Sequence, residues 1–280
     1  MATITALNIY PVKSCKGIPL QTGRVTTAGL EHDRQWLIVR PDGRFITQRE
    51  APRLALIETG IANGSLSLTS AQAGRLEVAV AADGPSVDVT CWQDRCAAFD
   101  MGEPAAQWLE AHLGAPHRLV RFDPSRKRPS NTQWTGDVEA LNQFSDGFPF
   151  LVISQASLND LNSRLPQPLP MNRFRPNIVI DGVSAYDEDL IDEFRMDGVV
   201  LRGVKPCTRC VITTTDQVTA ERDGVEPLRT LRTYRMSREL KGVLFGQNAI
   251  LLTGASRELR VGQSFEVTWQ SYIEGTSVTP

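Results

Sequence analysis

The chain has few cysteines, few histidines and no long hydrophobic run, and each of these shortages excludes a class of protein. Its 280 residues include 5 cysteines and 3 histidines. So few cysteines, and an odd number of them, argue against a disulfide framework and favour reduced thiols or metal ligands. No apolar run is long enough to span a bilayer, and the first residues lack the pattern of a signal peptide. We therefore expect a cytoplasmic protein that has no membrane partner.

The chain also lacks an excess of charge of either sign. Its 30 basic and 32 acidic residues give a formal net charge of −2, so no global field would attract nucleic acid or anionic lipid. The basic run at residues 126–128 has no interleaved aromatic side chains that could stack on bases. We interpret it as solvated surface in a loop or linker over residues 123–130. Any anion that binds must be held by a local cluster of cations.

Glycine-rich phosphate loops and alternating parallel βαβ units are missing as well, which argues against a Rossmann or P-loop enzyme. The length suits one large β-rich domain or two modest ones. Short apolar runs bounded by turn residues predict a mainly β fold of the α+β class, with an antiparallel barrel or sandwich in the first hundred residues. The strands are expected at residues 4–10, 35–39, 54–60, 65–68, 75–80, 86–92, 118–122, 150–154, 177–181, 199–204, 211–215, 248–253 and 264–269. Helices are expected at residues 103–113, 156–165 and 227–236.

The strongest local signal is a pair of cysteines, Cys207 and Cys210, between two predicted strands. Thiolates are natural ligands of soft metals, and the basic residues beside this pair favour the thiolate form. Two buried thiols that serve only as small hydrophobic side chains are the alternative. A tetrahedral zinc site would need two more ligands, and Cys91 with Cys96 could provide them. Spacing alone leaves these three interpretations open.

Two other segments group residues that suit an anion. Lys13 and Ser14 follow the first predicted strand, and Arg173, Arg175 and Asn177 precede a later one. Arginine binds two oxygens of a phosphate at fixed geometry. Either segment alone could be an ordinary loop with salt bridges. Together they predict a phosphorylated or otherwise anionic ligand close to the thiols.

The order of these segments resembles the MOSC family with its N-terminal β-barrel domain, the group that includes the mitochondrial amidoxime-reducing component and the bacterial hydroxylaminopurine-resistance reductases. The matching segments are YPVKSCKG at 10–17, GLEHDR at 29–34, RFRPN at 173–177, CTRC with TTTD at 207–216, and LRTYR at 231–235. This resemblance covers almost the whole chain. It implies a MOSC N-terminal β-barrel domain over residues 1–120 and a C-terminal MOSC β-barrel domain, with a few peripheral helices, over residues 121–280.

The resemblance further implies a molybdenum cofactor, whose metal is held by the dithiolene of a phosphorylated pterin and by one protein cysteine. Cys210 would be that metal ligand, and Cys207 a nearby thiol that does not bind the metal. Asp216 is a candidate for proton supply or for support of the ligand, chosen because it is close to Cys210 in sequence. The residues implied to bind the cofactor are Lys13, Ser14 and Arg34 at the phosphate end, and Ser154, Arg175, Asn177, Thr208 and Arg209 on the pterin and dithiolene side.

The implied activity is removal of oxygen from N-hydroxylated compounds such as hydroxylamines, amidoximes and N-hydroxylated bases. A non-catalytic carrier of the cofactor or of sulfur is the first alternative, and a zinc-stapled binding protein is the second. No cysteine follows Cys210, so we expect no iron–sulfur domain of the kind found in bacterial relatives. Electrons are therefore expected from a separate donor protein, such as a ferredoxin, a flavodoxin-type reductase or a cytochrome b5-like protein.

Overall fold

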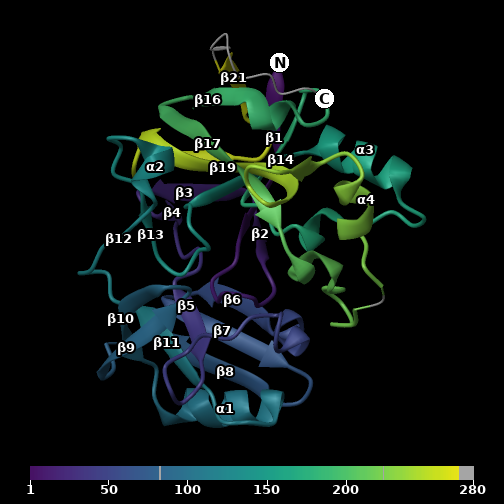
Figure 1. Cartoon of the computed structure of the whole chain (residues 1–280). Coiled ribbons are helices and arrows are strands. Elements are labelled where there is room, and N and C mark those ends of the chain that lie inside the picture. The colour runs from purple at the N-terminus through teal and green to yellow at the C-terminus, as the bar shows by residue number, and fades with distance from the viewer. Residues whose placement is uncertain (82, 223, 271–280) are drawn as a thin grey trace.

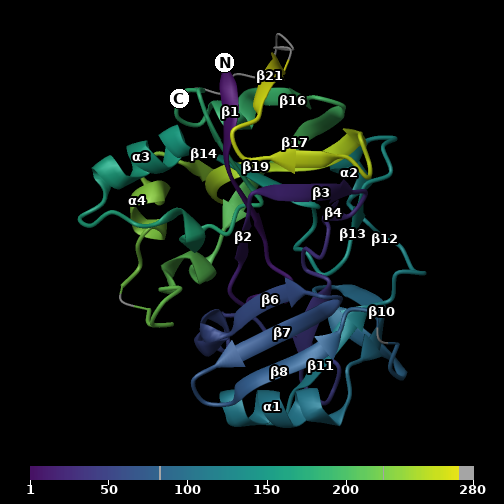
Figure 2. The ribbon, with the colours of Figure 1, turned by 180° about the vertical axis from the view of Figure 1, so that it is seen from behind.

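The structure is a computed structural model, and it describes residues 1–81, 83–222 and 224–270. Figure 1 and the reverse view in Figure 2 show two lobes. The upper lobe contains the N-terminal strand and most of the second half of the chain, and the lower lobe contains the segment around helix α1 (Glu103–Leu113). Within the described residues, no helix is both long enough and apolar enough to cross a membrane.

A closed β-barrel forms the upper lobe. Its strands are β1 (Ala2–Ile9), β14 (Phe150–Ser154), β15 (Ile178–Asp181), β16 (Ile191–Met196), β17 (Val199–Arg209), β19 (Gly242–Thr253) and β21 (Ser264–Trp269), and the short strands β2 (Ile18–Leu20) and β18 (Met236–Ser237) extend it. The order is β14-β15-β1-β21-β16-β17-β19, and the barrel closes because β14 also pairs with β19. The expectation of a mainly β fold with barrel domains is confirmed.

One parallel pair interrupts this antiparallel barrel. Strands β14 and β15 run parallel and are joined across helix α3 (Gln155–Arg164). The sequence analysis argued only against alternating units of this kind, and it did not identify this single βαβ unit. A single crossover of this kind leaves no alternating signal in the sequence, because the other pairs of the barrel are antiparallel.

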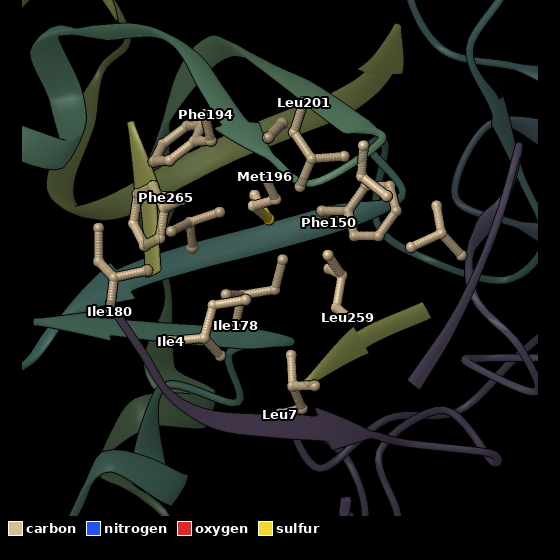
Figure 3. Close-up of a cluster of buried hydrophobic side chains, with 14 of the residues drawn as sticks. Ile4, Leu7, Phe150, Ile178, Ile180, Phe194, Met196, Leu201, Leu259 and Phe265 are labelled. Atoms are coloured by element: carbon tan, nitrogen blue, oxygen red, sulfur yellow. The ribbon is translucent and has the colours of Figure 1, made fainter. Parts of the chain in front are cut away.

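Side chains from alternate positions fill the barrel, as Figure 3 shows. Strand β1 buries Ile4 and then Leu7, a spacing that breaks the two-residue period of a strand. A register shift between Ile4 and Ala6 in the pairing with β15 adds the extra residue and returns the apolar side chains to the interior. Phe194 and Leu201 approach the same core from β16 and β17.

The lower lobe packs two small antiparallel sheets against one helix. One sheet has the order β5-β11-β10-β9 and the other β6-β7-β8. Helix α1 has a proline in its first turn, ends at Gly114 in the left-handed conformation, and buries Trp108 and Leu109 in a core shared with both sheets. The strands are β5 (Trp36–Val39), β6 (Glu58–Ala62), β7 (Ser65–Ser70), β8 (Gly74–Ala79), β9 (Ser86–Cys91), β10 (Asp94–Asp100) and β11 (Arg118–Phe122).

Shorter elements connect and flank the lobes. β20, β3 and β4 form a three-stranded sheet, and β12 pairs with β13. The bounds are β3 (Thr22–Thr26), β4 (Gly29–Leu30), β12 (Arg128–Pro129), β13 (Leu141–Asn142), β20 (Glu258–Arg260), α2 (Thr132–Thr135) and α4 (Leu228–Arg232), with 3₁₀ helices η1 (Pro52–Leu56), η2 (Met171–Arg173), η3 (Asp187–Leu190) and η4 (Val211–Thr214).

Three expected elements differ from the structure. The predicted strand at 211–215 is wrong, because Thr213 and Thr214 donate their hydroxyls back to main-chain carbonyls and close the turns of η4. The predicted strand at 54–60 begins only at Glu58, after a 3₁₀ helix that a proline starts. The predicted helix at 227–236 forms only over α4.

The expected solvated linker at 123–130 is also corrected. Arg128 in this segment is buried, where it pairs with Asp94 at 2.8 Å and donates to the carbonyl oxygens of Gln143 and Ser145. The basic run therefore helps to anchor the loop at residues 143–148, rather than forming only a solvated surface.

Candidate active site between the lobes

A pocket opens where segments of both lobes meet. It encloses about 820 Å³ of empty space, part of which is open to solvent. Eight of the ten residues predicted from the sequence to form the site lie in its lining, although the fold draws them from four distant segments. These eight are Lys13, Ser14, Arg34, Arg175, Asn177, Thr208, Arg209 and Cys210.

The end of strand β17 carries the thiols into the pocket. Cys207 lies near the end of β17. Cys210 is the first residue after this strand and the N-cap residue of η4. The Cys210 carbonyl oxygen accepts from the Thr213 amide at 3.0 Å and from its hydroxyl at 2.9 Å. These bonds fix the main chain at Cys210, while its side chain stays partly exposed in the pocket.

Positive charge dominates the lining. Four arginines and one lysine face a single carboxylate, that of Asp146. Lys13 is buried, and its ammonium group donates to the Phe144 carbonyl oxygen at 2.7 Å and to Asp146 at 2.5 Å. Arg34 pairs with Asp33, which lies behind the lining. Since the other three cations form no ion pair within the part of the chain that the structure describes, the pocket suits an anionic ligand. The five cations are Lys13, Arg34, Arg49, Arg175 and Arg209.

Two of these guanidinium groups stack on the buried ring of Tyr10. The Cζ atoms of Arg34 and Arg175 lie 4.3 Å and 4.2 Å from its centroid. Arg34 also donates to the Asn177 side chain at 3.1 Å and to the Arg175 carbonyl oxygen at 3.2 Å. Together with the ion pair to Asp33 at 2.6 Å, these contacts hold Arg34 rigidly.

Arg175 keeps a donor that the protein leaves free. Its Nη2 atom is buried and has no hydrogen-bond partner among the described residues. Burial lowers the pKa of Arg175 to about 10, and the neighbouring Arg34 adds to this effect, whereas Tyr10 opposes it. The side chain is therefore still charged at neutral pH. A buried charged donor without a partner is costly, so this atom is suited to an anion that binds in the pocket.

Each pocket thiol has a guanidinium beside it. Arg49 Nη2 lies 3.1 Å from Cys210 Sγ, and Arg209 Nη1 lies 3.0 Å from Cys207 Sγ. Cys15 is different, because burial raises the pKa of its thiol to about 12. The two pocket thiols, unlike Cys15, line the pocket, so they are the ones placed to bind a metal.

Ser154 and Asp216 lie outside this pocket lining. Ser154 is fully buried and caps helix α3, where its hydroxyl oxygen accepts from the Ser157 amide at 2.9 Å. The Asp216 carboxylate accepts from the Val218 and Thr219 amides and pairs with Arg173 at 2.7 Å. The structure thus gives both residues local structural contacts in place of the cofactor-binding and proton-supplying positions expected from the sequence.

The zinc interpretation is wrong for the described residues, which contain no group of three or more histidine, cysteine, aspartate or glutamate side chains placed to hold a metal ion. Cys91 and Cys96 instead belong to the apolar core of the β9–β10 hairpin. Burial raises the pKa of both thiols, that of Cys96 to about 11. They stay protonated at neutral pH and act as small hydrophobic side chains.

Arg49 and Asp146 are pocket residues that the sequence did not reveal. Arg49 lies in a turn before η1, and Asp146 lies in the loop after β13. Neither stands in a segment with a recognisable spacing of chemical groups. Only the folded chain brings them beside Cys210 and Lys13.

Comparisons with known proteins agree with this arrangement. The family model for the MOSC N-terminal beta barrel domain matches residues 1–116, and that for the MOSC domain matches residues 140–266. Mitochondrial amidoxime-reducing component 1 is 38% identical over 256 residues in Mus musculus (88% of this chain, 75% of the relative) and 38% identical over 267 residues in Homo sapiens (90% and 79%). The chain belongs to the MOSC family. Mitochondrial amidoxime reducing component 2 of Bos taurus is 33% identical, over 84% of this chain and 73% of the relative.

Membership in the MOSC family confirms the resemblance drawn from the five sequence segments. The two matched regions meet at the pocket of this MOSC protein. Lys13, Arg34 and Arg49 come from the N-terminal match, whereas Arg175 and Cys210 come from the MOSC domain match.

Proposed function

We propose that this MOSC protein is an oxidoreductase that uses a molybdenum cofactor to remove oxygen from N-hydroxylated compounds. The observation that carries the proposal is the partly exposed Cys210 thiol in a pocket lined by five cations and a single carboxylate. The names of the relatives, which are amidoxime-reducing components, support the substrate class. Hydroxylamines, amidoximes and N-hydroxylated bases are the substrates to test.

The residues present fit such a cofactor. The phosphate of the cofactor would compensate the positive charge of the pocket. The buried Nη2 donor of Arg175, which has no partner among the described residues, would donate a hydrogen bond to the cofactor. Lys13, Ser14 and Arg34 would hold the phosphate end, with Arg175, Asn177, Thr208 and Arg209 on the pterin side. Cys210 would provide the thiolate ligand, as its match to the second cysteine of the MOSC motif implies, and it is partly exposed in the pocket.

The bound cofactor supplies two-electron oxygen-atom chemistry, and the chain's own groups prepare the site for it. Tyr10 and Asp33 orient Arg34, and the Thr213 bonds fix the main chain at Cys210. Reduction of an N–O bond consumes two electrons and two protons and releases water. We propose that a separate donor protein, of the ferredoxin, flavodoxin or cytochrome b5 type, provides the electrons.

Replacing the two pocket cysteines tests the ligand assignment. We expect Cys210→Ala to lower the molybdenum content of purified protein by at least about tenfold, which is the lower end of the loss seen when even an outer partner of a metal site is removed. It should also abolish reduction of a model amidoxime with a chemical reductant. Cys207→Ala should keep most of both, because Cys207 is not the assigned ligand.

Circular dichroism and thermal melting serve as controls for the fold of both variants. An equal loss of molybdenum in the two variants would contradict the single-ligand assignment. If the parent protein contained molybdenum and pterin but reduced no N-hydroxylated compound, it would be a cofactor carrier and the proposed activity would be wrong.

A further inference from the structure

Arg49 places a charged hydrogen-bond donor on the sulfur atom assigned as the metal ligand. Its Nη2 atom lies 3.1 Å from Cys210 Sγ. We propose that Arg49 is a positioning residue of the metal centre, which orients the Cys210 thiolate and withdraws electron density from it, so that the bound molybdenum is more easily reduced. This inference rests on the proposed function, because it concerns the same cysteine.

The main chain at Arg49 is fixed on both sides. Its amide donates to the Thr47 hydroxyl at 3.1 Å, and its carbonyl oxygen accepts from Arg222 Nη1 at 3.1 Å. Arg222 also bonds the Gln48 carbonyl oxygen and donates to Thr215, which lies just after η4. The segment that contains Cys210 and the turn that contains Arg49 are therefore tied together, so their distance does not depend on the Arg49 side chain alone.

The Arg49 side chain is held by stacking on Trp92. The guanidinium carbon lies 4.7 Å from the centre of the indole ring, and the indole Nε1 donates to Asp146 at 3.2 Å. Trp92 lies at the tip of the β9–β10 hairpin with a positive φ of 60° and is 39% exposed. A bulky residue in the left-handed region is unfavourable unless its surroundings hold it there. Trp92, which belongs to the lower lobe, thus helps to hold the Arg49 guanidinium beside Cys210.

A donor in this position affects a metal in a predictable direction. Hydrogen bonds to a thiolate ligand reduce its electron donation, and such bonds are among the factors that set the potential of cysteine-ligated metal centres. Arg209 makes a comparable contact with the other pocket thiol, Cys207. Its second terminal nitrogen donates to the Phe174 carbonyl oxygen at 2.6 Å. Of the two arginines, Arg49 is the one that contacts the assigned ligand.

The test compares Arg49→Gln with Arg53→Gln in protein loaded with cofactor. Arg53 is exposed, lies in η1 and is not in the pocket lining, so it is a matched control. We expect Arg49→Gln to shift the molybdenum midpoint potential to a more negative value. At a fixed applied potential, the ratio of oxidised to reduced metal should rise about tenfold, which corresponds to about 30 mV for a two-electron couple. Arg53→Gln should match the parent.

Arg49→Lys and Trp92→Leu make the test independent of folding defects. Arg49→Lys keeps the charge and should recover part of the shift, and Trp92→Leu should shift the potential in the same direction as Arg49→Gln but less. A folded Arg49→Gln protein that loses molybdenum also supports the inference, provided that Arg53→Gln retains it. Full molybdenum content with an unchanged potential in Arg49→Gln would overturn it. Absence of molybdenum from the parent would instead refute the proposed function.

Discussion

Asp216 stands six residues after Cys210 in the sequence, yet its carboxylate closes a turn of the chain. The amide hydrogen bonds from Thr219 and Val218, together with Arg173, lower its pKa. A carboxyl group with a lowered pKa is ionised at neutral pH and has no proton to donate. At the scale of single residues, closeness in sequence therefore did not place this side chain in the pocket lining, and its proposed role in proton supply is left to experiment.

We expect Asp216→Asn to leave the pH dependence of turnover unchanged between about pH 6 and 8. The substitution should lower the stability at neutral pH, because a carboxylate with a depressed pKa stabilises the fold above its unfolded pKa of about 3.9 and loses this contribution as the pH falls. The difference from the parent in the urea midpoint should thus shrink below about pH 4. A displaced pH–rate profile at full cofactor content would restore Asp216 as a proton-transfer group.

The difference between closeness in sequence and contact in the folded chain also explains how much of the site the sequence revealed. Residue types with a definite chemical use, grouped within a few positions, identified Lys13, Arg175 and Cys210, and all three line the pocket. Arg49 and Asp146 stand alone in their segments, and their role depends on contacts across the fold. No local pattern encodes such contacts.

At the scale of elements, the long strands β17 and β19 bend to reach the pocket. Their pairing shifts register between Gly203 and Lys205 and again between Pro206 and Thr208. Gly246 of β19 has a φ of 84°, and a Cβ there would lie 2.6 Å from Ile153 Cγ1. Bulges and a glycine of this kind curve a barrel strand. The sequence predicted only parts of these strands, residues 199–204 and 248–253. It placed a separate strand at 211–215, where threonine hydroxyls instead close a 3₁₀ helix.

Gly246→Ala should destabilise the barrel more than Gly262→Ala does. Both glycines have a φ near 85°, but a Cβ at Gly262 would meet no atom within 4 Å. Gly262→Ala should therefore cost only the backbone strain, about 1–2 kcal/mol. Gly246→Ala should cost about 1–3 kcal/mol more because it also overpacks the contact with β14. Urea unfolding measures both, and equal losses would show that the barrel accommodates the added methyl group.

At the scale of the whole molecule, the pocket depends on contacts between distant parts of the chain. Gln48 and Gln217 exchange two side-chain hydrogen bonds of 3.0 Å, and Arg34 reaches Asn177 at 3.1 Å. The first strand, β1, is itself part of the barrel, where it lies between β15 and β21. The first 30 residues, which the sequence assigns to the N-terminal domain, are thus built into the upper lobe.

This arrangement predicts that residues 121–280 do not fold alone. Without β1 the barrel is open, and the apolar surfaces that Ile4, Leu7 and Ile9 cover are exposed. Burying three such side chains contributes roughly 5–9 kcal/mol, which is comparable with the whole stability of an ordinary domain, about 5–15 kcal/mol. Residues 121–280 should therefore show no cooperative unfolding transition in urea.

Adding back the missing strand separates this explanation from a general effect of truncation. A chain in which residues 1–30 are joined to residues 121–280 by a flexible linker should regain a cooperative transition, because β1 and β3 can again pair with β15, β21 and β20. It should still fail to retain molybdenum, since Arg34 and Arg49 are absent from it. Cooperative unfolding of residues 121–280 alone would show that the barrel closes without β1, and retention of molybdenum by the joined chain would show that the lower lobe is dispensable for the site.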